Sequence, residues 1–257
     1  MQQSLFGLST PQQSNNPSGL LAEPLVSFPS SVNEAEIKSL LMTNTQNQTP
    51  LSEAVFTVID LETTGLSPKK SSITEITAIQ YQQGKEIAKF TTLVKPHHVI
   101  PEEVELLTGI TNAMVRHSPS LPVVLGELSQ FLGETPLIVG HNVSFDVGFL
   151  YEKLEQNGLE MMTSRFDIQR SFCTKVLAKK ILPSLPSYEG IVVATAIGYH
   201  NPNPHRAEAD VRMSAAILYA LIEKLKLQAS DAETSSSSQA VETVGELLAL
   251  QGNLSAR

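Results

Sequence analysis

The alternation of apolar and polar positions predicts strands in the first half of the chain. Residues 55–61 (VFTVIDL) form an apolar, β-branched run, and residues 73–81 and 87–94 alternate with a period of two. Three consecutive strands are therefore expected to form a meander in which the first strand is the most buried. Short apolar segments at residues 137–139 and 166–168 predict a fourth and a fifth strand.

Apolar positions at helical spacing predict helices between and after these strands. The predicted helices cover residues 102–107, 122–132, 144–156, 170–181, 188–197 and 207–225. Ser144 is a natural N-cap for the third of them, and Gly158 can end it. Strands followed by strands mixed with helices indicate an α/β fold, in which a mixed sheet is flanked by helices.

The two ends of the chain differ in composition from its middle. Residues 1–50 are rich in Gln, Ser, Asn, Thr and Pro, and such segments bury too little apolar area to offset the entropy lost on ordering. Within them, residues 32–42 predict one or two helical turns. Residues 231–239 predict a flexible linker, and residues 241–250 predict a short helix. We therefore expect a disordered N-terminal tail (1–50), a folded domain (51–228) and a C-terminal linker with a short helix (229–257).

The composition restricts the cellular location and the partners that we expect for this protein. The 257 residues carry a net charge of −8 and include one cysteine, Cys173, which excludes an internal disulfide. No apolar run approaches the roughly 18 residues of a membrane span, and the first ten residues hold no Lys or Arg. We expect a cytoplasmic protein with no membrane partner. The acidic balance disfavours a basic surface that coats nucleic acid, but it leaves contact through bound cations open.

Two carboxylates stand at the end of the first predicted strand, in the sequence DLETTG. Residues two apart on a strand point to the same side, so Asp60 and Glu62 are expected to lie together. Adjacent like charges are costly unless they are neutralised, and Mg²⁺ prefers carboxylate oxygens. A metal site is one interpretation, and a solvated strand end before a Thr-Gly turn is the other.

Two further motifs place acidic residues at the start of helices. Asp146, in the sequence GHNVSFD, lies in the first turn of a predicted helix, where the helix dipole favours a negative charge in any protein. In the sequence HRAEAD, His205 precedes Asp210 by five residues, so the two can meet over one cleft, although a surface His beside a helical acid is a common arrangement. Phe145 and Phe149, four residues apart, indicate core packing rather than base stacking.

Together, the three motifs resemble those of the DnaQ-like, or DEDD, 3′–5′ exonucleases, in the branch whose third motif holds a histidine. The order D-x-E-T-T-G, H-N-x-x-F-D, H-x-x-x-x-D runs from Asp60 to Asp210, and the resemblance covers residues 55–225. It implies a ribonuclease-H-like fold with a five-stranded mixed sheet. It also implies an enzyme that releases nucleoside monophosphates from DNA 3′ ends, most simply from single strands, in proofreading or repair.

The same resemblance assigns roles to single residues. Asp60, Glu62, Asp146 and Asp210 match the family's metal-binding carboxylates, which implies two divalent ions, Mg²⁺ or Mn²⁺. His205 matches the general base that deprotonates the attacking water. The positions that match substrate-contacting or supporting residues are Thr63, Thr64, Gly65, Leu66, His141 and Asn142.

Two features depart from the family pattern. Glu208 stands where the family commonly has an apolar residue, so this extra carboxylate either tunes metal binding or faces water, and we expect the latter. Residues 188–198 resemble the family's helix at this position only loosely. The histidines that match no motif position are expected on the surface or in loops: His97, His98, His117 and His200.

The sequence leaves other functions open. An exoribonuclease of the same family would carry the same motifs, because recognition of the 2′-hydroxyl depends on the shape of the cleft. A non-catalytic adaptor for a polymerase or clamp is disfavoured because every motif residue is intact. Near the N-terminus, Gln2, Ser4, Leu5 and Phe6 resemble the peptide that docks bacterial replication proteins on the sliding clamp, although so short a match also fits a random tail.

Overall fold

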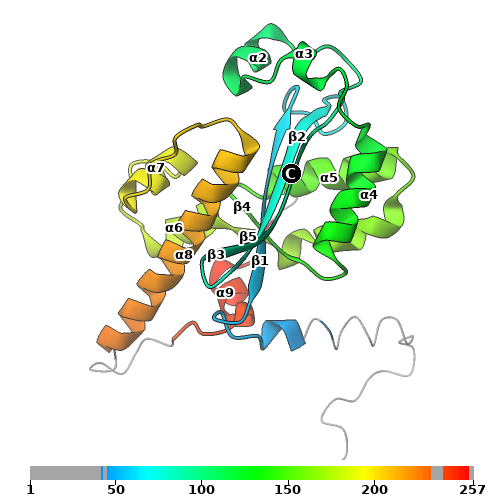
Figure 1. Ribbon diagram of the computed structural model, residues 1–257. Helices are drawn as coiled ribbons and strands as arrows, with labels where there is room; N and C mark the ends of the chain where they lie inside the picture. The colour runs from blue at the N-terminus through cyan, green and yellow to red at the C-terminus, as the bar shows by residue number, and fades with distance from the viewer. Residues whose placement is uncertain (1–41, 43–44, 233–239, 255–257) are drawn as a thin grey trace, which may run out of the picture. The chain divides into compact units, whose positions relative to one another are not determined.

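A five-stranded mixed sheet forms the centre of the computed structural model, which describes residues 42, 45–232 and 240–254 (Figure 1). Its strands are β1 (Val55–Thr63), β2 (Ile73–Gln82), β3 (Lys85–Leu93), β4 (Leu137–Gly140) and β5 (Phe172–Cys173). The order across the sheet is β3-β2-β1-β4-β5, with β1, β2 and β3 antiparallel and with β4 and β5 parallel to β1. The predicted meander and the mixed sheet are therefore confirmed.

Helices cover both faces of the sheet (Figure 1). One face carries α6 (Thr174–Ile181), α7 (Gly190–Ala196), α8 (Ala207–Ala232) and α9 (Val244–Gln251), and the other carries α4 (Leu121–Leu132), α5 (Ser144–Gln156) and the 3₁₀ helix η1 (Glu160–Phe166). The remaining helices are α2 (Glu102–Thr108), α3 (Asn112–Val115) and the 3₁₀ helix η2 (Ile168–Arg170). The longest helix, α8, packs along β1 and β2 and so brings its N-terminal residues to the sheet.

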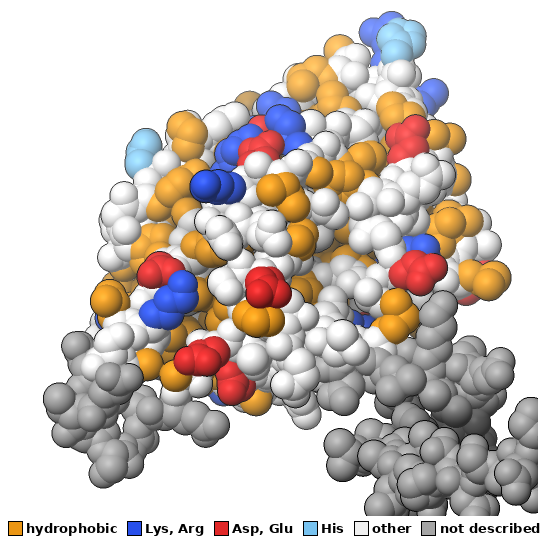
Figure 2. Space-filling view, turned by 60° about the horizontal axis from the view of Figure 1, so that its bottom comes forward, with side chains coloured by type: hydrophobic (Ala, Val, Ile, Leu, Met, Phe, Trp, Pro, Cys, Tyr) orange, Lys and Arg blue, Asp and Glu red, His pale blue; other side chains and the backbone are white. Residues whose placement is uncertain are grey.

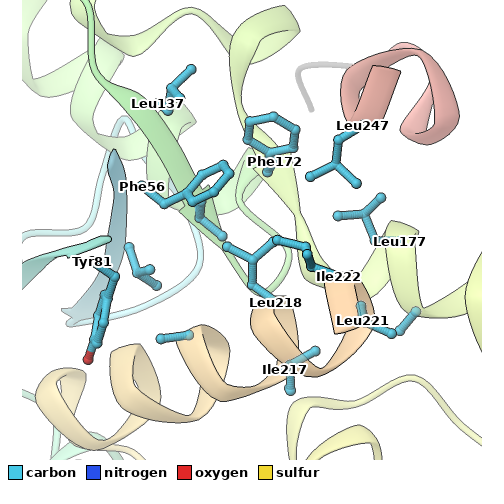
Figure 3. Packing of buried hydrophobic residues seen from close by; sticks show 14 of the residues in the cluster. Phe56, Tyr81, Leu137, Phe172, Leu177, Ile217, Leu218, Leu221, Ile222 and Leu247 are labelled. Carbon is cyan, nitrogen blue, oxygen red and sulfur yellow. The ribbon is translucent and has the colours of Figure 1, made fainter. Parts of the chain in front are cut away.

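The larger core lies between the sheet and α8. Phe56 of β1 and Phe172 of β5 are fully buried, and their rings meet edge to face at 5.5 Å between centroids. Figure 3 shows Leu218 of α8 beneath these rings and Leu247 of α9 pointing toward Phe172. Such burial of large apolar side chains is the main force that holds α8 against β1.

Three local predictions are corrected by the structure. The fifth strand lies at Phe172–Cys173 rather than at residues 166–168, which belong to η1, η2 and the residue between them. Asp167 caps η2 by accepting a hydrogen bond from the Gln169 N–H (2.9 Å), so this segment turns instead of extending. The helix expected from residue 170 begins at Thr174, and the N-cap of α5 is Val143 rather than Ser144.

The described segments on both sides of the expected folded domain pack against it. The Leu51 N–H donates to the Glu242 carbonyl (2.8 Å), and Val244 of α9 is fully buried. The domain therefore extends beyond the boundaries expected at residues 50 and 228, because α9 supplies side chains to its core. Residues 1–41, with the clamp-like peptide and most of the helical turns expected over 32–42, lie outside the described residues. No helix in the described part of the chain is long and apolar enough to span a membrane.

Candidate metal centre

Three carboxylates from distant parts of the chain meet at the end of β1. Asp60 and Glu62 lie two residues apart on this strand, so both side chains project from the same face. Asp210 comes from the first turn of α8, which packs across β1. One oxygen from each of the three residues lies within 4.8 Å of the others. The packing of α8 thus completes a group that β1 begins.

The electrostatics of this group call for a cation. Burial, together with the neighbouring carboxylates of Asp210 and Glu75, raises the pKa of Glu62 to about 8, although the Arg206 guanidinium opposes the rise. Burial and the nearby acids also hold the pKa of Asp60 well above its ordinary value. A cluster of carboxylate oxygens whose like charges are unneutralised fits a hard divalent ion.

The fourth expected carboxylate, Asp146, lies against β1 but outside that group of three. It is buried in the first turn of α5, and its Oδ1 accepts a hydrogen bond from the Leu61 N–H at 3.2 Å. Burial raises the pKa of Asp146 to about 8, while hydrogen bonds from the backbone oppose the rise. Because Leu61 separates the two carboxylates of β1, Asp146 sits beside both of them.

His205 lies over the same site as Asp210, as its spacing predicts. Its N–H donates to Asp210 Oδ2 at 2.9 Å, and its backbone has a φ of +63°. The ring is exposed and lines a cleft of about 490 Å³ that Asp60 and Asp210 also line.

The surface of the protein shows no single basic patch on the face drawn in Figure 2, where Lys and Arg side chains lie beside Asp and Glu.

A buried amide that sequence reasoning missed holds Asp210 in place. Asn201 donates through Nδ2 to Asp210 Oδ1 at 2.7 Å, and its own Oδ1 accepts from the Asn203 N–H at 3.1 Å. The side chain is buried and lines the cleft. Its signal in the sequence is weak, because the NPNP segment reads as an ordinary loop.

His141 supports the wall of the cleft. Its Nδ1 bonds to Thr174 Oγ1 at 2.9 Å and its Nε2 to the Tyr188 carbonyl at 3.0 Å. Burial lowers the pKa of His141, and a neutral ring can donate from Nε2 while it accepts at Nδ1. Gly190 passes so close that a Cβ there would lie 2.7 Å from Met213 Cε and 3.4 Å from the His141 ring. His141 therefore joins the end of β4 to the segments that begin α6 and α7.

The loop after β1 is closed by its own hydrogen bonds. Thr63 Oγ1 donates to the Gly65 carbonyl (2.7 Å), and Thr64 exchanges bonds with Ser72 through its N–H and its Oγ1 (both 2.9 Å). A Cβ on Gly65 would lie 2.9 Å from Ser71 Oγ, so only glycine fits without a shift. Leu66, at the tip, is 86% exposed. The loop thus presents an apolar side chain on a braced backbone.

The remaining candidates lie as follows. Asn142 adopts a φ of +73° at the turn between β4 and α5. Glu208 pairs with Arg212 at 2.9 Å and with Lys89 at 3.0 Å, and hydrogen bonds from both lower its pKa, so it takes no part in the carboxylate group. Phe149 is fully buried, and Phe145 packs against its ring at 4.8 Å. The four histidines outside the motifs are all exposed: His97, His98, His117 and His200.

A mixed sheet whose central strand ends in acidic residues, with a helix supplying a further carboxylate, defines the ribonuclease-H-like class of nucleases. The family model of exonucleases (RNase_T) matches residues 57–218. The chain belongs to this exonuclease family, of the DnaQ-like type, and the acidic residues at the end of β1 are able to bind metal.

The relatives named in this comparison are replication and nuclease proteins. The chain is 35% identical over 175 residues to the DNA polymerase III subunit epsilon of Aquifex aeolicus, covering 68% of this chain and 84% of that protein. It is 31% identical to the 3′-5′ exonuclease DinG of Bacillus subtilis and 34% identical to the PolC-type DNA polymerase III of Clostridium perfringens. The match spans only 18% and 11% of those two proteins.

Solved structures share the fold. Escherichia coli exonuclease I in complex with a dT13 oligonucleotide superposes with a TM-score of 0.60 and 19% identity, over 72% of this chain and 44% of that one. Exonuclease X in complex with 5′ overhanging duplex DNA gives 0.53 and 23%, over 77% and 99%. These likenesses confirm the predicted ribonuclease-H-like architecture.

Proposed function

We propose that this protein removes nucleotides one at a time from the 3′ end of single-stranded DNA, in replication proofreading or repair. The observation that carries the proposal is the grouping of Asp60, Glu62 and Asp210 beside a cleft that Asp60, Asp210 and His205 line. The epsilon-like relative and the oligonucleotide complexes of exonuclease I support DNA as the substrate.

The carboxylates have the task of holding divalent cations. Asp60, Glu62 and Asp210 would bind Mg²⁺ or Mn²⁺, with Asp146 as the fourth ligand of a two-ion site. Such ions, when bound, stabilise the negative charge that develops on the attacking and leaving oxygens of a phosphodiester. The protein holds the four carboxyl groups close together, because the end of β1 and the first turns of α5 and α8 pack against one another.

His205 has the task of taking the proton from the attacking water. An imidazole can take up a proton near neutral pH, and positioned bases of this kind are worth about 10²–10⁴ in rate. The ring is exposed at the cleft, where a water beside the carboxylates would lie within its reach. Once protonated, it can pass the proton to solvent.

The loop after β1 is suited to the terminal nucleotide. Thr63, Thr64 and Gly65 offer a braced backbone, and Leu66 offers an exposed apolar side chain on which a base can lie. His141, which lines the cleft, and Asn142 next to it would hold that part of the wall in shape. This assigns substrate contact to Leu66 and support to His141.

The test is a gel time course on matched 5′-labelled single-stranded DNA and RNA oligonucleotides, with Mg²⁺ or EDTA. The wild type should give a metal-dependent ladder that shortens from the 3′ end, faster on DNA. His205→Ala should slow it by about 10²–10⁴-fold, whereas the control His200→Ala, an exposed histidine five residues earlier, should not. Faster RNA degradation would make the protein an exoribonuclease, and the absence of any ladder would favour an adaptor.

We propose in addition that Gln2, Ser4, Leu5 and Phe6 dock the protein on a sliding clamp and so bring it to a DNA polymerase. These residues lie outside the described part of the chain, and the proposal rests on the sequence and on the polymerase III relatives. Deleting residues 1–8 should weaken clamp binding and leave hydrolysis of short oligonucleotides unchanged. Equal clamp affinity after the deletion would refute this partner.

A further inference from the structure

An ion pair next to His205, between the buried Glu75 and the partly exposed Arg206, is not explained by metal binding. Glu75 lies on β2 directly opposite Glu62 of β1, and its side chain is 7% exposed. Its Oε1 accepts from Arg206 Nη2 (2.8 Å), and its Oε2 accepts from Arg206 Nε (3.2 Å) and from the Ala207 N–H (3.0 Å). The Glu75 carboxylate thus accepts hydrogen bonds from both residues that follow His205.

The backbone around His205 is held from two sides. Glu75 fixes Arg206 and Ala207 on the C-terminal side, while the His205 N–H donates to Asp210 Oδ2. Between these anchors His205 adopts a φ of +63°, a left-handed conformation that non-glycine residues hold only when their surroundings impose it. Its ring is exposed, so the direction of the ring depends on this backbone rather than on packing.

The position of Glu75 is electrostatically unfavourable for a purely structural role. Its charge adds to that of Glu62, whose pKa it raises, so a neutral side chain would hold α8 against β2 without this repulsion. The carboxylate at this position makes a bidentate contact, which fixes the orientation of a guanidinium as well as its distance. An ion pair that is largely withdrawn from water adds little net stability, but it can fix one conformation.

We propose that Glu75 is a positioning residue for His205, acting through Arg206 and the first residue of α8. This rests on the proposed role of His205 as the base. Glu75 holds the turn in the one conformation that aims the imidazole at the water beside the carboxylates. Arg206 is the link between them, and neither residue needs to touch the substrate.

The test is a double-mutant cycle of Glu75→Gln and His205→Ala, measured as kcat and KM on a single-stranded oligonucleotide. A misplaced catalytic group can cost about 10²-fold, so Glu75→Gln should lower kcat by about 10- to 100-fold with little change in KM. In the His205→Ala background, the same substitution should change kcat by less than about twofold, because the group that it aims is absent. The matched control is Glu86→Gln, which likewise removes the charge from an ion pair with α8 (Arg212, 2.8 Å) and should leave kcat unchanged.

Chemical rescue by imidazole distinguishes a loss of His205 positioning from a loss of protein stability. His205→Gly suits the positive φ, and added imidazole should restore part of its activity. The rescued rate should be the same with and without Glu75→Gln, since free imidazole needs no aiming by the chain. Should Glu75→Gln fail to fold, Arg206→Lys takes its place, because lysine keeps the charge but loses the fork.

Two results would overturn the proposal. One is an equal loss from Glu75→Gln in the presence and absence of the His205 side chain, which would place Glu75 with the carboxylate group instead. The other is an unchanged kcat in a folded Glu75→Gln variant. Failure of the proposed function is seen separately: His205→Ala alone would retain full activity if His205 were not the base, and the wild type itself would give no measurable kcat if the protein were not a nuclease.

Discussion

Two regions of this protein bury polar groups in opposite ways. At the end of β1, the carboxylates of Asp60, Glu62 and Asp210 face one another, and burial raises the pKa of each. At the edge of the sheet, Gln251 of α9 is also buried, but its Oε1 accepts from the Cys173 N–H at 2.6 Å. The first region places like charges close together, and the second pairs a hydrogen-bond donor with an acceptor.

The sheet edge shows how buried polarity stabilises a fold. Gln251 also donates through Nε2 to the Ser171 carbonyl at 2.9 Å, so its amide bonds to the edge strand β5 as a neighbouring strand would. Edge strands expose unpaired backbone groups, and covering them prevents pairing with other chains. The contrast teaches that the carboxylate cluster lowers the stability of the fold, which is expected at a functional site.

The largest effect that the comparison predicts comes from Asp60→Asn. Loss of a metal ligand removes several kcal/mol of charge stabilisation, so activity should fall by about 10³-fold or more. The metal-free variant should melt at the same or a higher temperature than the wild type, because a repelling charge is gone. Nuclease assays and thermal melting in EDTA check both parts. If Asp60→Asn retained its activity or were clearly destabilised, the carboxylate cluster would not differ from the Gln251 region in the way proposed.

The next effect is stabilisation by metal. An ion that binds only the folded state adds about 2.7 kcal/mol at a concentration 100 times its Kd. Adding Mg²⁺ or Mn²⁺ should therefore raise the melting temperature of the wild type by several degrees and leave that of Asp60→Asn unchanged. Glu127→Gln, which alters an exposed acid on α4, is the control and should respond like the wild type. No shift in the wild type would argue against a metal site at β1.

The juxtaposition of the candidate residues at the end of β1 followed more directly from the sequence than the edge of the sheet did. Asp60 and Glu62 share a strand, and His205 and Asp210 lie five residues apart, so short-range geometry already pairs them. Strand β5 has two residues, too few for a period to show, and the prediction fell six residues early on an apolar segment that forms 3₁₀ turns.

The contacts that escaped prediction depend on the tertiary fold. Glu75 and Arg206 are 131 residues apart, and Gln251 and Cys173 are 78 apart. No periodicity or spacing reveals such pairs, because they exist only once α8 and α9 have docked. Asn201 is close to Asp210 in sequence, but its loop gives no sign that the amide turns inward.

A smaller effect is expected at the sheet edge itself. Gln251→Ala leaves the Cys173 N–H and the Ser171 carbonyl unpaired in the interior, which costs about 1–3 kcal/mol. Urea unfolding should show this loss, whereas nuclease activity at low temperature should stay at the wild-type level. The matched control is Gln228→Ala, which removes an exposed amide from α8 and should change stability by less than about 0.5 kcal/mol. A loss of activity in folded Gln251→Ala would mean that the two regions are coupled.

The smallest effect should come from the cap of α9. Thr243 accepts from the Glu246 N–H (3.3 Å), and Glu246 accepts from the Thr243 N–H (2.9 Å), which completes a capping box. Thr243→Ala should cost about 1 kcal/mol in urea unfolding, against no measurable cost for Ser230→Ala at the exposed end of α8. If Thr243→Ala lowered the free energy of unfolding more than Gln251→Ala does, the docking of α9 would depend more on the formation of the helix than on the hydrogen bonds of Gln251 with the β5 edge. The edge of the sheet would then be covered only after α9 had formed.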